Sequence, residues 1–263
     1  MNSISKRTAR RSPIKGPIAR QPGQGLNEYL ENFSNEEILK AVLPVGFVIW
    51  WFSIELIHRY TQRSTPLWLL GLLFVATLLF SIMRIRRCWN TMRKIQRGID
   101  GERYVAQIIE RDLIPSGYRA LHDLPFEKDG RKFNIDHLLI GPNGVFCIET
   151  KTWSKPFRGE TIATYDGSEI LLNGVSRCGN AVGQARALAK FAEEQIKKLT
   201  GISVKVHSFV VCVGWFVRRT CAEPPDVLVV NEEALSAFVK ACRGTLDNAD
   251  LDQIWNRLKD AFS

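Results

Sequence analysis

Two long apolar stretches, at residues 41–57 and 67–83, interrupt the otherwise mixed pattern of apolar and polar positions. The second stretch holds 17 consecutive positions without a charge, and the first carries a single acid, Glu55, near its end. A helix of 17 residues is about 26 Å long, close to the minimum that crosses a bilayer. The short polar linker at 58–66 predicts a helical hairpin. We therefore expect two transmembrane helices within residues 38–85, with a pair of buried helices in a soluble protein as the alternative.

Basic residues flank the second apolar stretch unevenly. The 20 residues after Met83 hold seven Lys and Arg, whereas the linker holds only Arg59 and Arg63. Because positive flanks mark the cytoplasmic side, both ends of the chain are predicted to be cytoplasmic in a multi-pass protein of the cell (inner) membrane. Residues 86–98 form a basic juxtamembrane linker, and residues 1–37 a basic, largely disordered tail. Both segments are either solvated or in contact with anionic lipid, and the tail could also contact nucleic acid.

The remainder of the chain, residues 99–263, has the pattern of a soluble mixed α/β domain. It is predicted to begin with a helix at 99–114 that has Asp100 as its N-cap. A later helix at 179–199 ends at Gly201. The other elements indicated by apolar runs and turn signals are strands at 118–125, 133–140, 144–151, 203–213 and 226–230, a polar hairpin at 157–173, and helices at 231–242 and 247–262.

Three charged residues lie inside the second and third predicted strands. If Gly141 pairs with Gly144 across a two-residue turn, Asp136 lies directly opposite Glu149. Lys151 lies two positions further along its strand and so points to the same face. The sequence therefore predicts one small patch with two carboxylates and a lysine.

Such a patch has a chemical and a structural interpretation. Two carboxylates at that distance repel each other unless a cation lies between them, and a hard divalent ion such as Mg²⁺ (or Mn²⁺) suits oxygen ligands. The lysine could then orient an attacking water or stabilise developing negative charge. The alternative is a surface hairpin with a solvated salt bridge. The neighbouring positions are apolar, however, which favours strands that are covered on both faces.

The same residues resemble a nuclease family. An Asp on one strand followed by Glu-x-Lys on the next resembles the PD-(D/E)xK superfamily, although Ile135 stands where the superfamily has a Pro. The segment "IDHLLIGPNGVFCIETKTW", preceded by "GERYVAQIIE", is similar to sequences of the nuclease-related domain (NERD) branch. The similarity covers roughly residues 98–215. The resemblance implies a restriction-endonuclease-like core, a mixed central sheet flanked by helices, after the transmembrane hairpin. It maps the family's helical Glu to Glu102 and its Gln to Gln184.

The resemblance implies a membrane-anchored, metal-dependent nuclease on the cytoplasmic side, with DNA as the default substrate. Asp136, Glu149 and Glu102 would bind the metal ion. Lys151 would assist the water, and Gln184 would orient the water or a phosphate. A non-catalytic, membrane-tethered binding or scaffold protein that retains the nuclease fold is the alternative. Retention of all the acids and the lysine favours the enzyme.

Charge and cysteine content change this interpretation little. Residues 1–98 carry 15 Lys and Arg against 5 Asp and Glu, whereas residues 99–263 carry 21 against 22. The net charge of +9 therefore belongs to the first third of the chain and does not argue for DNA binding by the α/β domain. A local basic patch of Lys151, Lys155 and Arg158 is still available. The six cysteines form no C-x-x-C pair, which indicates reduced thiols in a cytosolic domain.

Overall fold

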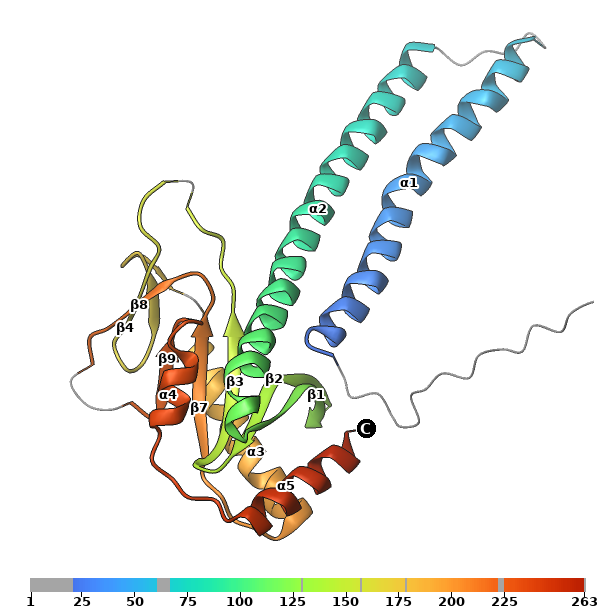
Figure 1. The fold of residues 1–263 in the computed structure, drawn as a ribbon. Helices are drawn as coiled ribbons and strands as arrows, with labels where there is room; N and C mark the ends of the chain where they lie inside the picture. The colour runs from blue at the N-terminus through green and yellow to red at the C-terminus, as the bar shows by residue number, and fades with distance from the viewer. Residues whose placement is uncertain are drawn as a thin grey trace, which may run out of the picture.

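The protein consists of a long helical pair and an α/β domain (Figure 1). The computed structural model describes residues 21–60, 67–128, 130–156, 158–177, 179–221 and 225–262. The helical pair is formed by α1 (Gln24–Tyr60) and α2 (Leu67–Asp112), which run side by side away from the domain. The last turns of α2 also belong to the domain, because they pack on its central sheet.

The helix α2 continues without a break from the hairpin into the domain. Its 46 residues span about 69 Å at the helical rise. The predicted helix start at 99 is therefore wrong, because Asp100 lies inside α2 and is not an N-cap. The segment 86–98 is likewise part of this helix and not a separate linker. After α2 ends, a short 3₁₀ turn at Ile114–Ser116 leads into the first strand.

The start of α1 corrects the predicted tail, and its composition bears on the predicted membrane anchor. Because α1 begins at Gln24, the last part of the 1–37 segment is helical and not disordered, while residues 1–20 lie outside the described residues. Of the helices that the structure describes, one, α1, is long and apolar enough to cross a membrane. The second apolar stretch, 67–83, lies in α2, and the two-span hairpin stays a prediction.

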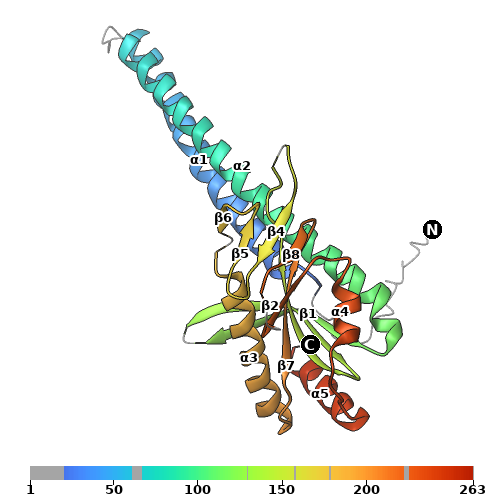
Figure 2. The same ribbon diagram turned by 90° about the vertical axis from the view of Figure 1, so that its left-hand side faces the viewer.

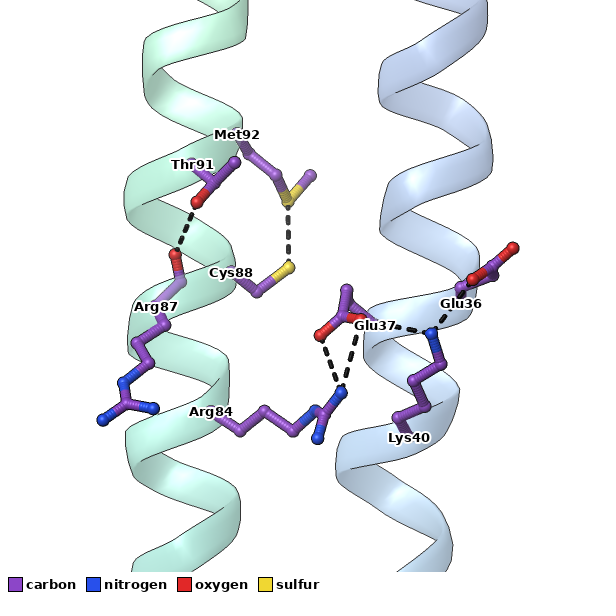
Figure 3. A network of polar contacts seen from close by, with 8 residues as sticks. All are labelled: Glu36, Glu37, Lys40, Arg84, Arg87, Cys88, Thr91 and Met92. Atoms are coloured by element: carbon purple, nitrogen blue, oxygen red, sulfur yellow. Dashed lines mark hydrogen bonds and ion pairs between the residues drawn. The ribbon is translucent and has the colours of Figure 1, made fainter.

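Polar contacts join α1 to α2. The Ser81 hydroxyl donates to the carbonyl oxygen of Ala41 at 2.9 Å, and both residues are buried. Nearer the domain, the Arg84 guanidinium donates to both oxygens of Glu37, at 3.0 and 3.3 Å, and Lys40 also donates to Glu37 (Figure 3). These contacts fix how the two helices lie against each other.

The central sheet has five strands in the order β1-β2-β3-β7-β9. β1 pairs antiparallel with β2 and β2 antiparallel with β3, whereas β3, β7 and β9 run parallel. This mixed sheet confirms the predicted mixed α/β class. The strands are β1 (Arg119–Lys128), β2 (Arg131–Gly141), β3 (Gly144–Lys151), β7 (Val206–Cys212) and β9 (Val227–Val230).

Helices cover both faces of this sheet (Figures 1 and 2). The end of α2 and the helix α4 (Leu235–Ala241) pack on one face, and α3 (Ala181–Thr200) and α5 (Asn248–Ala261) pack on the other. Side chains of β3 alternate between the two layers, with Phe146 toward α2 and Val145 toward α3. Burial on both sides explains why β3 is apolar along most of its length.

A smaller four-stranded sheet, in the order β6-β5-β4-β8, packs beside the main one. The strands β4 (Ile162–Tyr165) and β5 (Ile170–Leu172) form the hairpin that was predicted at 157–173, and β6 (Ser176–Arg177) extends it. The sequence analysis missed β8 (Phe216–Arg219), which pairs parallel with β4. Its side chains are mostly exposed, so no apolar periodicity marks it.

The hairpin between β2 and β3 has the predicted register. Gly141 pairs with Gly144, as the two-residue turn requires. The side chain of Asn143, inside that turn, donates to the carbonyl oxygen of Val239 at 2.7 Å and accepts from the Tyr118 hydroxyl at 2.7 Å. The turn is therefore fastened to α4, which keeps the two strands in register along their length.

Candidate active site

The strands β2 and β3 separate where the charged residues begin. Their pairing ends at His137 and Ile148, one position before Asp136 and Glu149. Two residues beyond Ile148, the N–H of Thr150 donates to Asp136 Oδ2 at 2.7 Å. The carboxylate thus takes the place of a main-chain acceptor where the ladder opens, and β3 continues with β7 as its partner. Asp136 and Glu149 therefore lie where β2 and β3 begin to separate.

Lys151 joins the strand to the helix α3. Its Nζ donates to Glu149 Oε1 at 2.6 Å and to Gln184 Oε1 at 3.1 Å. The Glu149 side chain is 3% exposed, whereas that of Lys151 is 25% exposed. Gln184 lies in the first turn of α3, where the Asn180 side chain accepts from the N–H of Gly183 and caps the helix. Three of the five predicted site residues therefore meet in one hydrogen-bonded chain.

Glu102 approaches the same opening from α2. It is buried and accepts a hydrogen bond from the main-chain amide of Gly23. Burial, followed by the charges of Asp123 and Glu149, raises the pKa of Glu102 to about 7. Burial, followed by Glu149 and Glu102, raises the pKa of Asp136 well above its ordinary value. The negative charge of Glu149 thus disfavours ionisation of both Asp136 and Glu102, which lie close to it.

One oxygen in this group has no donor. Glu149 Oε2 is buried and, among the described residues, has no hydrogen-bond partner. Burial raises the pKa of Glu149, and the ammonium of Lys151 opposes that shift. A buried carboxylate oxygen without a donor is costly, so a further positive charge at this point would stabilise the site.

A divalent ion suits part of this acidic group. Carboxylate oxygens are the ligands that Mg²⁺ and Mn²⁺ prefer, and mutual repulsion is what such an ion relieves. Within the described ranges, however, no three His, Cys, Asp or Glu side chains lie close enough together to hold a metal. Asp136 and Glu149 have the charge and the oxygen ligands that suit a cation. Glu102 does not lie close enough to both of them to complete a set of three ligands.

Asp123 is the acidic residue that the sequence analysis missed. It lies in β1 with a φ of 50°, and the β1–β2 pairing skips it between His122 and Leu124. Its carboxylate is buried and accepts from the Gly25 amide at 2.8 Å and from Asn134 Nδ2 at 2.5 Å. An acid in the middle of the apolar strand predicted at 118–125 was the available signal.

A histidine pair lies on the other face of β2. The Nδ1 atoms of His122 and His137 are 2.8 Å apart, and His137 Nε2 lies 3.3 Å from the Thr150 hydroxyl. Burial lowers the pKa of His122 to about 4 and that of His137 well below its ordinary value. Both rings are therefore neutral near pH 7. His137 points away from the carboxylate of Asp136, as strand alternation predicts, and has an architectural role.

The first turn of α1 is packed tightly against the acidic group. A Cβ at Gly25 would lie 2.6 Å from Asn134 Nδ2 and 3.2 Å from Asp123 Oδ1, which leaves no room for it. Gly25→Ala should therefore disturb these contacts and lower the free energy of unfolding by about 1–2 kcal/mol.

The matched control is Gly46→Ala, in the same helix, because nothing lies within 4 Å of a Cβ at that position. Alanine there should be neutral, or stabilising by up to about 1 kcal/mol through its helix propensity. Urea unfolding of the full chain in detergent measures both variants. Equal effects at Gly25 and Gly46 would contradict the docking of α1 on the acidic group.

Comparisons with known proteins support the resemblance to a nuclease-related domain. Residues 97–213 match the family model of the Nuclease-related domain, and this range contains all five predicted site residues. No curated protein matches the chain. Among solved structures, the chain is similar to protein VC1899 from Vibrio cholerae, with 10% sequence identity and a TM-score of 0.26. That match covers 87% of this chain and 59% of the Vibrio cholerae protein, so the chain spans less than two thirds of that protein's length.

Proposed function

We propose that this protein is a membrane-anchored nuclease that uses Mg²⁺ (or Mn²⁺) to hydrolyse phosphodiester bonds, with DNA as the first substrate to test. The nuclease-related match over residues 97–213 supports the class of activity. The observation that carries the proposal concerns the two carboxylate oxygens of Glu149. Oε1 accepts a hydrogen bond from Lys151, whereas Oε2 is buried and has no donor among the described residues. A PD-(D/E)xK type of site accounts for both the acids and the lysine.

The residues take distinct roles in this proposal. Asp136 and Glu149 would hold the cation, with Glu102 adding negative charge nearby, and the cation would supply a Lewis acid that activates water. Lys151 is exposed enough to reach a phosphate and would stabilise the negative charge that develops on it. Gln184 accepts from Lys151 and so keeps that ammonium directed at the substrate.

A cleavage assay on the full chain in detergent tests the proposal. Supercoiled, linear and single-stranded DNA, together with RNA, are incubated with Mg²⁺, Mn²⁺ or EDTA. We expect cleavage of at least one substrate with either metal and none with EDTA. Absence of cleavage under every condition, by a chain shown to be folded, would contradict the proposed activity.

A tethered binding or scaffold protein is the second candidate, and one observation favours it. Lys151 is already engaged by Glu149, and the described carboxylates do not form a three-ligand set. In that case the charged residues are an internal ion pair that stabilises the opening between β2 and β3. Nucleic-acid binding without cleavage would favour this candidate.

The membrane part of the proposal is supported by the exposed apolar surface of the helical pair. Soluble proteins rarely expose apolar patches of this extent, whereas lipid is a suitable solvent for them. The large apolar side chains of this surface that are more than half exposed include Val42, Leu43, Phe47, Trp50, Leu56, Ile57, Leu72 and Leu79.

Both apolar stretches should therefore hold the chain in a bilayer. The full-length protein should stay in the membrane fraction after carbonate extraction. Reporter fusions after Gln62 and after Arg97 should report opposite sides of the membrane, with the second in the cytoplasm. Recovery of the protein in the soluble fraction, or an external reporter after Arg97, would contradict the two-span anchor.

A further inference from the structure

A groove lined by aromatic and basic side chains lies beside the candidate active site. It has a volume of about 550 Å³ and lies between α2 and the loop that follows β3, which runs alongside α2 in both views (Figures 1 and 2). The helix contributes Arg97 and Tyr104 to the groove, and the loop contributes Trp153 and Lys155. None of these four residues has a role in the chemistry proposed above.

Two residues that line the groove are sequence neighbours of predicted site residues. They are Gly101, the neighbour of Glu102, and Thr152, the neighbour of Lys151. A Cβ at Gly101 would collide with the Thr152 side chain, so α2 and the end of β3 touch at this point. The segments of α2 and β3 that carry Glu102 and Lys151 therefore lead directly into the wall of the groove.

Both aromatic side chains of the groove are partly accessible, and the ring of Trp153 is held in place by packing. Tyr104 is 45% exposed. Trp153 is partly buried and packs edge-on against the buried Trp215, with ring centroids 6.3 Å apart and an interplanar angle of 85°. Such packing fixes the plane of the Trp153 ring, which makes it a rigid surface for stacking.

Two basic side chains, Arg97 and Lys155, line the groove together with these rings. The Arg97 guanidinium donates to the Ser154 hydroxyl, which ties α2 to the loop. Lys155 Nζ lies next to Gly214, which also lines the groove. Asp100 also lines the groove, and its carboxylate can accept from the amino group of a base.

We propose that this groove binds the unpaired bases of a single-stranded nucleic acid whose backbone passes the acidic group; the direction of that backbone rests on the proposed function. Cations that track phosphates and aromatic rings that stack on bases are the two features of single-strand sites. A volume of about 550 Å³ is within the range of small-ligand pockets and accepts one or two bases. A duplex keeps its bases paired and stacked, so their faces cannot reach Trp153. An anionic lipid headgroup could use Arg97 and Lys155 but has no flat ring for Trp153 or Tyr104.

The test measures binding separately from cleavage. A fluorescein-labelled oligo-dT strand is titrated with the full chain in phosphatidylcholine nanodiscs, with EDTA present, and its fluorescence anisotropy is recorded. Trp153→Ala should weaken binding by about 5- to 100-fold, the range for loss of one stacking ring, and Trp153→Phe should retain most of the affinity. Phe216→Ala is the matched control, because this aromatic residue is 61% exposed on β8, outside the groove, and its loss should change nothing.

Each outcome decides the inference. Unchanged binding by Trp153→Ala, or equal affinity for a blunt duplex of the same length, would overturn it. Cleavage of duplex DNA by a chain that does not bind the strand would overturn it while leaving the proposed function intact. Strand binding through Trp153 by a chain that cleaves nothing would support the inference and count against the proposed function. If phosphatidylserine in the nanodiscs abolishes the Trp153-dependent binding, the groove belongs to lipid headgroups and the inference is wrong.

Discussion

Replacing Asp136 with Asn should lower the rate of metal-dependent DNA cleavage by at least about 10²- to 10³-fold, because one of the two nearest carboxylates at the site is lost. The amide oxygen of Asn can still accept from the Thr150 N–H, so the opening between β2 and β3 should keep its shape. Initial rates of plasmid nicking by the full chain in Mg²⁺ measure the effect.

The control for this substitution is Asp226→Asn. Asp226 is paired with Arg186 on the surface and contacts none of the predicted site residues in any described hydrogen bond, and exposed ion pairs contribute little to stability. Cleavage by that variant should equal the wild-type rate. If the Asp136 and Asp226 variants both cleave at the wild-type rate, Asp136 has no part in the chemistry.

Truncation of the strand core should have the largest effect on stability. Phe146→Ala should lower the free energy of unfolding by about 3–5 kcal/mol, the usual cost of removing a fully buried Phe. Phe146 is fully buried, and its ring packs against those of Tyr118 and Phe209, with centroids 6.2 and 6.0 Å away. Urea unfolding in detergent, followed by tryptophan fluorescence, measures the change.

Phe216→Ala is again the natural control, because its ring is 61% exposed and its loss should cost no more than about 0.5 kcal/mol. A Phe146 variant as stable as the Phe216 variant would contradict the packing of β3 between two helical layers. Because β3 carries Glu149 and Lys151, loss of that packing would also disturb the candidate site.

Strand register was predictable because local chemistry determines it. A two-residue turn pairs Gly141 with Gly144, and a period of two then fixes the face of every side chain on both strands. The proximity of Asp136, Glu149 and Lys151 follows from that register alone. Gln184 and Glu102, by contrast, came from the family resemblance, because the packing of α3 and α2 on the sheet is a tertiary property.

The wrong helix start at residue 99 and the omission of Asp123 from the predicted site also have physical causes. Asp100, between Ile99 and Gly101, has the appearance of a helix start, yet α2 continues through it and Gly101 makes a close contact with Thr152. Asp123 was not predicted as a site residue because its positive φ and its contact with α1 are tertiary features that no local pattern indicates. Tertiary packing overrode local preference at both places.

The contact between α1 and the acidic group could not be predicted from any local pattern. The Gly25 amide reaches a carboxylate 98 residues later, and the Gly23 amide reaches Glu102. A fragment that begins near residue 96 would lose both donors and leave Asp123 and Glu102 without them. The full chain is therefore the appropriate material for every assay of this site.

The central claim is that the coupled carboxylates hold a divalent cation, and thermal unfolding tests it most directly. Wild type and Asp136→Asn are each melted in EDTA, Mg²⁺ and Mn²⁺. Without metal the variant should be at least as stable as wild type, because it removes repulsion with Glu149 and Glu102. Metal at 100 times its Kd should stabilise the wild type alone, by about 2.7 kcal/mol. A strongly destabilised variant, with no effect of metal on either protein, would contradict the claim and make these charges a structural ion pair.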